Sequence, residues 1–244
     1  MSENSFFFYD DDATLVGTHT GAGERIFVLI HGIGMGRRVF AGLAELLADA
    51  GQVIALDLPG FGDSPEPGKA RTMQETADLV ADYLRQLHAA ELVLIGHSMG
   101  TQIVTEVAAR HPELVSKLVL IAPTVNVVER TAARQAWRMV QDLLGEAPKV
   151  LILGGWQYAK AGIPWFLRKL RIMLEHDVES SYPKIQAPTL VLRGETDKVC
   201  PRDWVQHVAK IVPNSRYDEV PGHGHEAMIR DPADAARLIL AFAE

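Results

Sequence analysis

Ser98 lies in the pentapeptide Gly96-His-Ser-Met-Gly100, a Gly-x-Ser-x-Gly pattern that can make a serine nucleophilic. The pentapeptide follows the strand-like segment Glu91–Ile95 and precedes a segment with helical periodicity, Thr101–Arg110. A strand, a sharp turn and a helix in this order expose the serine oxygen at the carboxyl end of a sheet, and small flanking residues let the turn close. This context predicts that Ser98 is a nucleophile rather than an incidental serine in a glycine-lined turn.

A serine hydroxyl needs a general base near neutral pH, and the base needs a third group that holds its tautomer. His225 follows the last predicted strand and Asp197 follows the strand before it, so both side chains are expected at the same sheet edge as Ser98. Their order along the chain, serine then aspartate then histidine, also fits. Glu195 falls too early in its turn to be the preferred acid, whereas His223 is a rival to His225 on position alone.

An acyl-transfer site also needs an oxyanion hole, made of two N–H groups aimed at the oxygen of the tetrahedral intermediate. We predict the backbone N–H groups of Met99, directly after the nucleophile, and of Ile33. Ile33 lies in the glycine-rich segment 31–36, whose backbone can approach a substrate closely. The residues expected to bind substrate around these donors are His31, Gly32 and His97.

The hydrophobic pattern supplies a sheet that can bring these residues together. Short apolar, β-branched runs alternate with longer amphipathic stretches, as in a parallel sheet covered by helices on both faces. The predicted strands are Phe6–Tyr9 and Thr14–Thr18, which form an edge hairpin, followed by Arg25–Ile30, Gln52–Leu56, Leu92–Ile95, Leu118–Ala122, Thr189–Leu192 and Arg216–Val220. The predicted helices are Arg38–Ala50, Thr72–His88 with a capping box at its start, Met99–His111, Pro201–Ile211 and Pro232–Phe242.

The stretch from Thr124 to Lys184 interrupts this alternation, because it shows only helical patterns, at 128–144, 148–161 and 164–174. We therefore expect residues 1–123 and 185–244 to form the core domain and residues 124–184 to form a helical lid inserted after the sixth strand. Two interpretations of the lid's tryptophans stay open: they line an apolar acyl pocket, or they anchor the lid on the core. These tryptophans are Trp137, Trp156 and Trp165.

The lid segment is also basic, with eight basic and three acidic residues between Glu129 and Arg171, in a chain of net charge −7. Arg130, Arg134 and Arg138 recur at every fourth position and share one helix face. This stripe is either a solvated outer face or an attractive surface for an anionic substrate.

Composition bounds the number of domains and the class of partner. The 244 residues, 48% of them apolar, suit one compact domain with an insertion, and the negative charge argues against a nucleic-acid partner.

Neither a signal peptide nor a membrane span is expected, and a single cysteine, Cys200, is compatible with a reducing compartment. We expect a soluble, cytoplasmic protein, monomeric or homodimeric. Neither a cofactor nor a metal is expected, since Arg37 replaces the third glycine of a dinucleotide motif and the histidines lack ligand spacing.

Five motifs in sequence order resemble the α/β-hydrolase superfamily along essentially the whole chain. They are His31-Gly32, Asp57-Leu-Pro-Gly-Phe-Gly-Asp-Ser64, Gly96-His-Ser-Met-Gly100, Pro188-Thr-Leu-Val-Leu-Arg-Gly-Glu-Thr-Asp197, and Pro221-Gly-His-Gly-His225 followed by Asp231-Pro232. The resemblance implies the α/β-hydrolase fold, a mostly parallel eight-stranded sheet with helices on both faces and a helical lid after the sixth strand. The last motif commonly reads Pro-Gly-x-Gly-His in similar proteins, which implies that His225 is the catalytic histidine and that His223 is a variable position.

The resemblance also implies hydrolysis through a covalent intermediate on Ser98. Similar enzymes that open epoxides or cleave carbon–halogen bonds use aspartate as nucleophile, so serine at position 98 disfavours those reactions. We expect cleavage of a small carboxylic ester through an acyl-enzyme. Hydrolysis of carbon–carbon bonds in aromatic ring-cleavage products is an alternative, as are thioesterase, lactonase and perhydrolase activities. A ligand-binding receptor without turnover is the non-enzymatic alternative, against which the complete triad argues.

Overall fold

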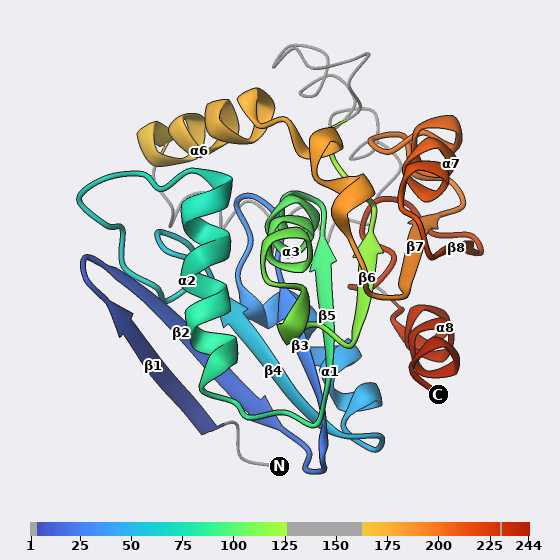
Figure 1. Cartoon of the computed structure of the whole chain (residues 1–244), viewed down its shortest axis with the longest axis horizontal. Helices are drawn as coiled ribbons and strands as arrows, with labels where there is room; N and C mark the ends of the chain where they lie inside the picture. The colour runs from blue at the N-terminus through green and yellow to red at the C-terminus, as the bar shows by residue number, and fades with distance from the viewer. Residues whose placement is uncertain (1–3, 126–162, 230) are drawn as a thin grey trace.

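The structure is a computed structural model that describes residues 4–125, 163–229 and 231–244. Its centre is one eight-stranded sheet with the spatial order β1-β2-β4-β3-β5-β6-β7-β8 (Figure 1). The strands are β1 Asn4–Asp10, β2 Ala13–Thr20, β3 Arg25–Ile30, β4 Gln52–Asp57, β5 Glu91–His97, β6 Lys117–Ile121, β7 Thr189–Gly194 and β8 Ser215–Val220. β2 runs antiparallel to β1 and β4, and every other neighbouring pair is parallel. The mostly parallel eight-stranded sheet expected from the sequence is confirmed.

Helices cover both faces of the sheet, as the alternating pattern predicts. α2 and α3 lie in front of the sheet in Figure 1, while α1 lies behind it and packs against α8. The helices are α1 Ala41–Leu47, α2 Met73–Arg85, α3 Met99–Arg110, α6 Ile163–Glu175, α7 Arg202–Ile211 and α8 Ala233–Ala243. Among the helices in the described ranges, none combines the length and the apolar character that a membrane crossing requires.

The first two helices differ in what sets their starts. The predicted helix Arg38–Ala50 is instead a helical turn, Arg37–Phe40, followed by the shorter α1, which ends at Leu47. Asp57 accepts the backbone N–H of Arg37 at the start of that turn. The predicted capping box of α2 is confirmed: Glu75 N–H donates to Thr72 Oγ1, and Thr72 N–H donates to a carboxylate oxygen of Glu75. A local cap therefore sets the start of α2, whereas a long-range contact holds the first residue of the helical turn that precedes α1.

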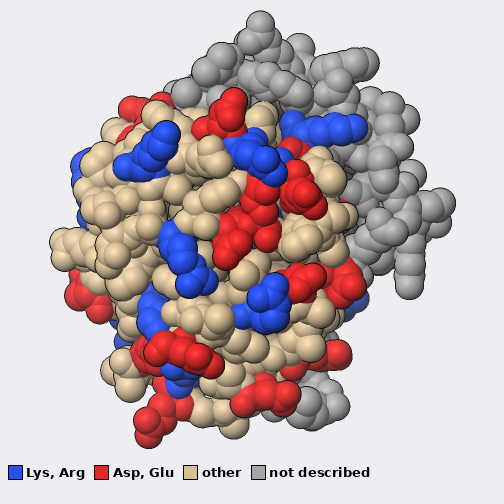
Figure 2. All heavy atoms as spheres, turned by 90° about the vertical axis from the view of Figure 1, so that its right-hand side faces the viewer, with Lys and Arg blue, Asp and Glu red and all other residues tan. Residues whose placement is uncertain are grey.

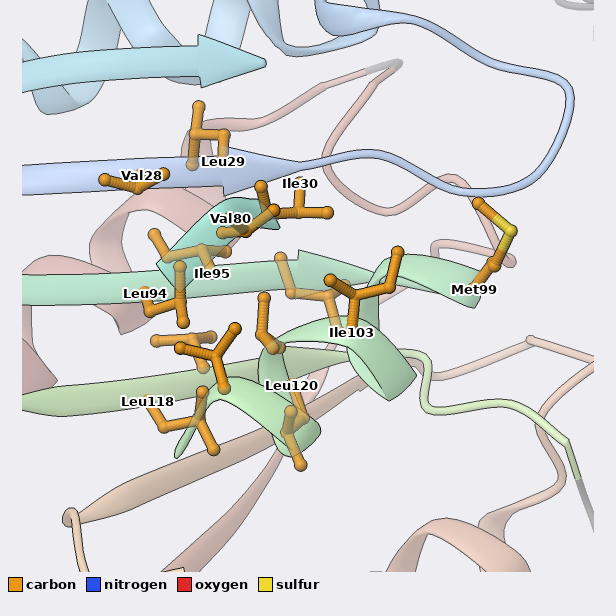
Figure 3. Close-up of a cluster of buried hydrophobic side chains, with 14 of the residues drawn as sticks. Val28, Leu29, Ile30, Val80, Leu94, Ile95, Met99, Ile103, Leu118 and Leu120 are labelled. Atoms are coloured by element: carbon orange, nitrogen blue, oxygen red, sulfur yellow. The ribbon is translucent and has the colours of Figure 1, made fainter. Parts of the chain in front are cut away.

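The central strands are buried on both faces, which fixes their carboxyl ends. Val28, Leu94 and Leu118 are register partners across β3, β5 and β6. Figure 3 shows this row in one buried cluster with Val80 of α2 and Ile103 of α3, and none of these five side chains has exposed surface. Burying one such aliphatic side chain contributes roughly 1.5–3 kcal/mol. Packing on this scale holds the loops after β3 and β5 in fixed positions.

α6 matches the predicted helix at 164–174 and is joined to the core by buried polar contacts. Gln102 Nε2 of α3 donates to the backbone oxygens of Thr124 and Met173, each at 3.1 Å. Lys169 Nζ donates to the backbone oxygen of Arg71 at 2.9 Å. Leaving a buried polar group without such a bond costs about 1–3 kcal/mol. These contacts fix α6 above α2 and α3.

Several expectations fall on residues outside those described. They are the predicted helices at 128–144 and 148–161, the arginines Arg130, Arg134 and Arg138, and the tryptophans Trp137 and Trp156. The division into a core (1–123 and 185–244) and a lid (124–184) therefore stays a prediction, and so does the anionic-substrate interpretation of the arginine stripe.

Lys169 gives a prediction about stability and pH. This residue is 4% exposed, and burial lowers the pKa of its ammonium group from 10.5 to about 8. Between these pH values the unfolded chain binds a proton that the folded chain does not, so Lys169 makes the free energy of unfolding rise with pH. We expect the free energy of unfolding of the wild type to rise by roughly 1–3 kcal/mol between about pH 8 and 10.5. This rise should be absent in Lys169→Met.

Urea denaturation of wild type and Lys169→Met across this pH window measures the difference. The exposed Lys184 supplies the control, because Lys184→Met should keep the wild-type rise. Identical pH dependence of unfolding in wild type and Lys169→Met would contradict the lowered pKa.

The face that carries α7 and α8 mixes charges of both signs. Figure 2 shows this face, with acidic and basic side chains interspersed across it. Arg202 of α7 and Arg193 of β7 both pair with Glu219 of β8, at 2.6 and 2.7 Å. Among the described residues of this face, the interspersed charges leave no extended patch of one sign, and a patch of positive sign is what attracts polyanions.

Candidate active site

The chain turns sharply between β5 and α3, and Ser98 occupies the turn with φ 53° and ψ −121°. A Cβ atom on Gly100 would lie 2.3 Å from the backbone oxygen of Ile30, and one on Gly96 would lie 2.6 Å from that of Gly100. Both values are below the 3.0 Å that real Cβ atoms keep, so neither position accepts a side chain. The glycines therefore let α3 begin against the end of β3, with Ser98 presented at the sheet edge.

Three side chains meet at this edge. Ser98 Oγ lies 3.0 Å from His225 Nε2, and His225 Nδ1 lies 3.0 Å from Asp197 Oδ2. When Nδ1–H donates to the carboxylate, Nε2 carries the lone pair that accepts the serine proton. The other carboxylate oxygen of Asp197 accepts the N–H groups of Val199 and Cys200, both at 2.8 Å, which fixes its orientation. This arrangement can activate a serine hydroxyl.

The two rival residues make hydrogen bonds within the neighbouring loops. His223 Nδ1 lies 2.7 Å from the backbone oxygen of Pro221. Glu195 accepts a backbone N–H from the same loop at 2.9 Å. Of the two histidines that position alone left open, His225 is the one within hydrogen-bond distance of Ser98.

The loop after β3 passes directly beside the nucleophile. A Cβ atom on Gly32 would lie 3.1 Å from Ser98 Cβ, which is tighter than an ordinary van der Waals contact, so a side chain here would press on the nucleophile. Ile33 and Met99, the predicted oxyanion-hole residues, are 4% and 0% exposed. Met99 is the first residue of α3, where an N–H has no acceptor within the helix. These positions are compatible with the predicted oxyanion hole, which stays a proposal.

A buried ion pair ties the loop after β3 to the loop after β4. Arg37 contacts the carboxylate of Asp57 through its guanidinium and its backbone N–H, and Asp63 N–H donates to the same carboxylate at 2.8 Å. Arg37 and Asp57 are 6% and 1% exposed. A Cβ atom on Gly62 would lie 2.2 Å from the carboxylate, so a glycine is required there. We assigned Asp57 no role from the sequence, although it opens the second of the five family motifs.

A model of the alpha/beta hydrolase family matches residues 27–238, a range that includes Ser98, Asp197 and His225. The chain belongs to the alpha/beta hydrolase family. The matched range begins within β3 and ends within α8, so it includes most of β3 and the whole of the other five parallel strands. The resemblance inferred from the five sequence motifs is confirmed.

Known proteins similar to this hydrolase catalyse more than one reaction. A pimeloyl-acyl-carrier-protein methyl ester esterase from Chromobacterium violaceum is 28% identical over 242 residues, which cover 89% of the hydrolase and 93% of the relative. A 2-hydroxy-6-oxo-6-(2'-aminophenyl)hexa-2,4-dienoic acid hydrolase from Metapseudomonas resinovorans is 26% identical over 249 residues, which cover 91% and 84%. The solved structure of a thermophilic esterase from Thermogutta terrifontis has a TM-score of 0.82 at 22% identity over 99% of the hydrolase and 98% of that chain, a likeness of fold. Hydrolytic chemistry is common to the three.

Two histidines of the hydrolase expected to bind substrate are fully buried. His31 Nε2 accepts Leu58 N–H at 3.0 Å, and His97 Nε2 donates to the backbone oxygen of His225 at 2.9 Å. Burial lowers the pKa of both imidazoles, that of His97 well below its ordinary value, so both are neutral near pH 7. His31 directly follows β3 and His97 is the last residue of β5, so each stands where a buried strand meets its loop. A side chain without exposed surface does not touch a substrate in this conformation, so we assign both a positioning role, whereas Gly32 lies beside Ser98.

Trp165 is the one predicted lid tryptophan that falls in the described residues, and it is 2% exposed. A Cβ atom on Gly60, in the loop after β4, would lie 2.1 Å from the indole Nε1. The indole therefore lies directly on this loop. This contact favours the anchoring interpretation of Trp165 over a place in an acyl pocket.

His97 gives a prediction about positioning of the general base. Leucine at position 97 removes the donor to the His225 carbonyl and lets the base shift, so we expect His97→Leu to lower kcat by up to roughly 100-fold with little change in KM. Glutamine can supply an N–H at a similar reach, and His97→Gln should recover most of the loss. Steady-state kinetics on one ester separates kcat from KM for both variants. Equal kcat values for the leucine and glutamine variants would refute this role.

Proposed function

We propose that the hydrolase cleaves small carboxylic esters through an acyl-enzyme on Ser98. The observation that carries the proposal is the hydrogen-bonded series from Ser98 through His225 to Asp197, with 3.0 Å at each step. A serine, an imidazole and a buried carboxylate in series activate the hydroxyl for attack on a carbonyl carbon. The methyl ester esterase among the relatives supports the same class of bond.

In the first step Ser98 Oγ attacks the ester carbonyl carbon while His225 Nε2 accepts the hydroxyl proton. The oxyanion accepts the backbone N–H groups of Ile33 and Met99, each of which lowers the barrier by about 2.7–4 kcal/mol. His225 then gives its proton to the departing alkoxide, and an acyl-enzyme is left. Water attacks this intermediate with His225 again as base, which releases the acid and restores Ser98.

Hydrolysis of a carbon–carbon bond is the second candidate function. The observation that favours it is the relative that hydrolyses 2-hydroxy-6-oxo-6-(2'-aminophenyl)hexa-2,4-dienoic acid. The same three side chains would serve that reaction, so the distinction lies in the substrate.

A substrate panel combined with a fluorophosphonate probe tests the proposal. The panel contains short p-nitrophenyl esters, an acyl thioester, a lactone and a vinylogous diketone. We expect kcat/KM for the esters to exceed the other values by at least about tenfold, and the probe to label wild type but not Ser98→Ala. Faster cleavage of the diketone would instead assign carbon–carbon hydrolysis. Ligand binding without labelling or turnover would indicate a receptor and contradict the proposal.

A further inference from the structure

The side of His225 that faces away from Ser98 lies in a cluster of metal-binding groups. His225 Nδ1 is 3.0 Å from Asp197 Oδ2 and 3.9 Å from Cys200 Sγ. One ligand atom from each residue lies within 4.8 Å of the other two, and all three residues are buried. A carboxylate, an imidazole and a thiolate are the ligand types that hold Zn²⁺ in proteins.

The backbone around this cluster is fixed independently of any ion. Asp197 and Cys200 share the loop after β7, and Arg193 donates to the backbone oxygens of both, at 2.7 and 3.1 Å. Cys200 N–H donates to Asp197 Oδ1, and Cys200 Sγ donates to the backbone oxygen of Pro123 at 3.4 Å. Outer contacts of this kind orient metal ligands. Two ligands from one rigid loop therefore meet His225 without backbone rearrangement.

The two separations from His225 Nδ1 are close to those of a tetrahedral site. With metal–nitrogen distances of roughly 2.0–2.1 Å and metal–sulfur distances of about 2.3 Å, neighbouring ligand atoms are separated by about 3.3–3.6 Å. The separations of 3.0 Å from Nδ1 to Oδ2 and 3.9 Å from Nδ1 to Sγ lie on either side of this range. The remaining pair, the Asp197 carboxylate and Cys200 Sγ, lies within 4.8 Å, so side-chain shifts without movement of the backbone would bring the three ligands to coordination distance.

We propose that Asp197, Cys200 and His225 bind a thiophilic divalent cation, Zn²⁺ or Cd²⁺, and that the bound ion inhibits the enzyme. The ion takes the lone pair at His225 Nδ1, and the imidazole proton moves from Nδ1 to Nε2. The Cys200 thiol releases its proton to solvent, and water completes the coordination. With a proton on Nε2, His225 has no lone pair for the Ser98 hydroxyl, so general-base catalysis stops. The inhibition rests on the proposed function, whereas the binding does not.

Binding is measured without reference to activity. Because Cys200 is the single cysteine of the 244-residue chain, thiolate-to-metal charge-transfer absorption reports this site alone. We expect titration of the full chain with Cd²⁺ to produce this band at one ion per chain. Ser98→Ala is the matched control and should keep the band, while Cys200→Ala and Cys200→Ser should lose it and His225→Ala should weaken the binding. Absence of the band in wild type would overturn the proposal even if the enzyme hydrolyses esters.

Inhibition is measured with Zn²⁺ on ester hydrolysis, for wild type and both Cys200 variants, each relative to its own metal-free rate. We expect the Zn²⁺ concentration that gives half inhibition to be higher in both variants than in wild type. Loss of an outer-shell partner alone costs roughly 10- to 100-fold in metal affinity, so loss of a ligand should raise this concentration by more than that. A chelator should restore activity, and Mg²⁺, which prefers oxygen ligands, should have no effect. Equal Zn²⁺ sensitivity of wild type and both variants overturns inhibition through this cluster. A chain that binds Cd²⁺ through Cys200 but cleaves no ester supports the metal site and refutes the ester proposal.

Discussion

Ser98→Ala is expected to lower kcat for a p-nitrophenyl ester by roughly 10⁴- to 10⁶-fold, because residues that act together in a triad lose nearly all of their effect when one is removed. The substitution deletes one oxygen from a side chain that is 6% exposed, so the fold should persist. Initial rates at high enzyme concentration measure the residual kcat, and fluorophosphonate titration of active sites excludes contaminating wild type.

An exposed serine provides the matched control. Ser180 Oγ donates to the backbone oxygen of Asp177 at 2.9 Å, so Ser180→Ala should keep wild-type kcat. The double variant Ser98→Ala/His225→Ala should be no slower than Ser98→Ala alone, since the base has no hydroxyl left to activate. A Ser98→Ala variant that retains kcat within about tenfold of wild type would exclude the acyl-enzyme.

His225→Ala is expected to cause a loss of roughly 10⁴- to 10⁶-fold in kcat, whereas His223→Ala should change kcat by no more than about threefold. His225 is 3.0 Å from both Ser98 and Asp197, while the hydrogen bond of the His223 ring is to Pro221 in its own loop. The two histidines share one loop, so each variant controls for disturbance of that loop in the other. Kinetics on one ester, with thermal unfolding of both variants, gives the comparison. A greater loss in His223→Ala would reassign the base.

The strands of the sheet were predictable because each buried parallel strand carries apolar side chains on both faces. The bounds of β3 agree with the predicted Arg25–Ile30. β4 and β5 extend past their apolar runs to Asp57 and His97, because these polar residues still pair with neighbouring strands, opposite Val16 and Ile121. Hydrophobic pattern therefore locates a strand, and the sheet partners decide where it ends.

The candidate site was predictable where a residue follows a strand and unpredictable where two loops meet. Ser98, Asp197 and His225 each stand after a recognisable strand, so their convergence follows from strand order alone. The bond from His97 to the carbonyl of His225 joins residues 128 positions apart, and nothing in the sequence near either residue signals it. The contact of Cys200 with His225 is of the same kind, since it depends on how two loops pack.

The backbone conformation of Ser98 lowers the stability of the fold at the same residue that supplies the nucleophile. Its φ of 53° with ψ of −121° lies outside the regions that L-residues prefer, and conformations of this kind cost of order 1–3 kcal/mol. Glycine adopts positive φ without that cost but supplies no nucleophile. Under selection for thermal stability alone, glycine would therefore replace serine at this position, and the chain would be more stable but inactive. Only selection for turnover retains the serine.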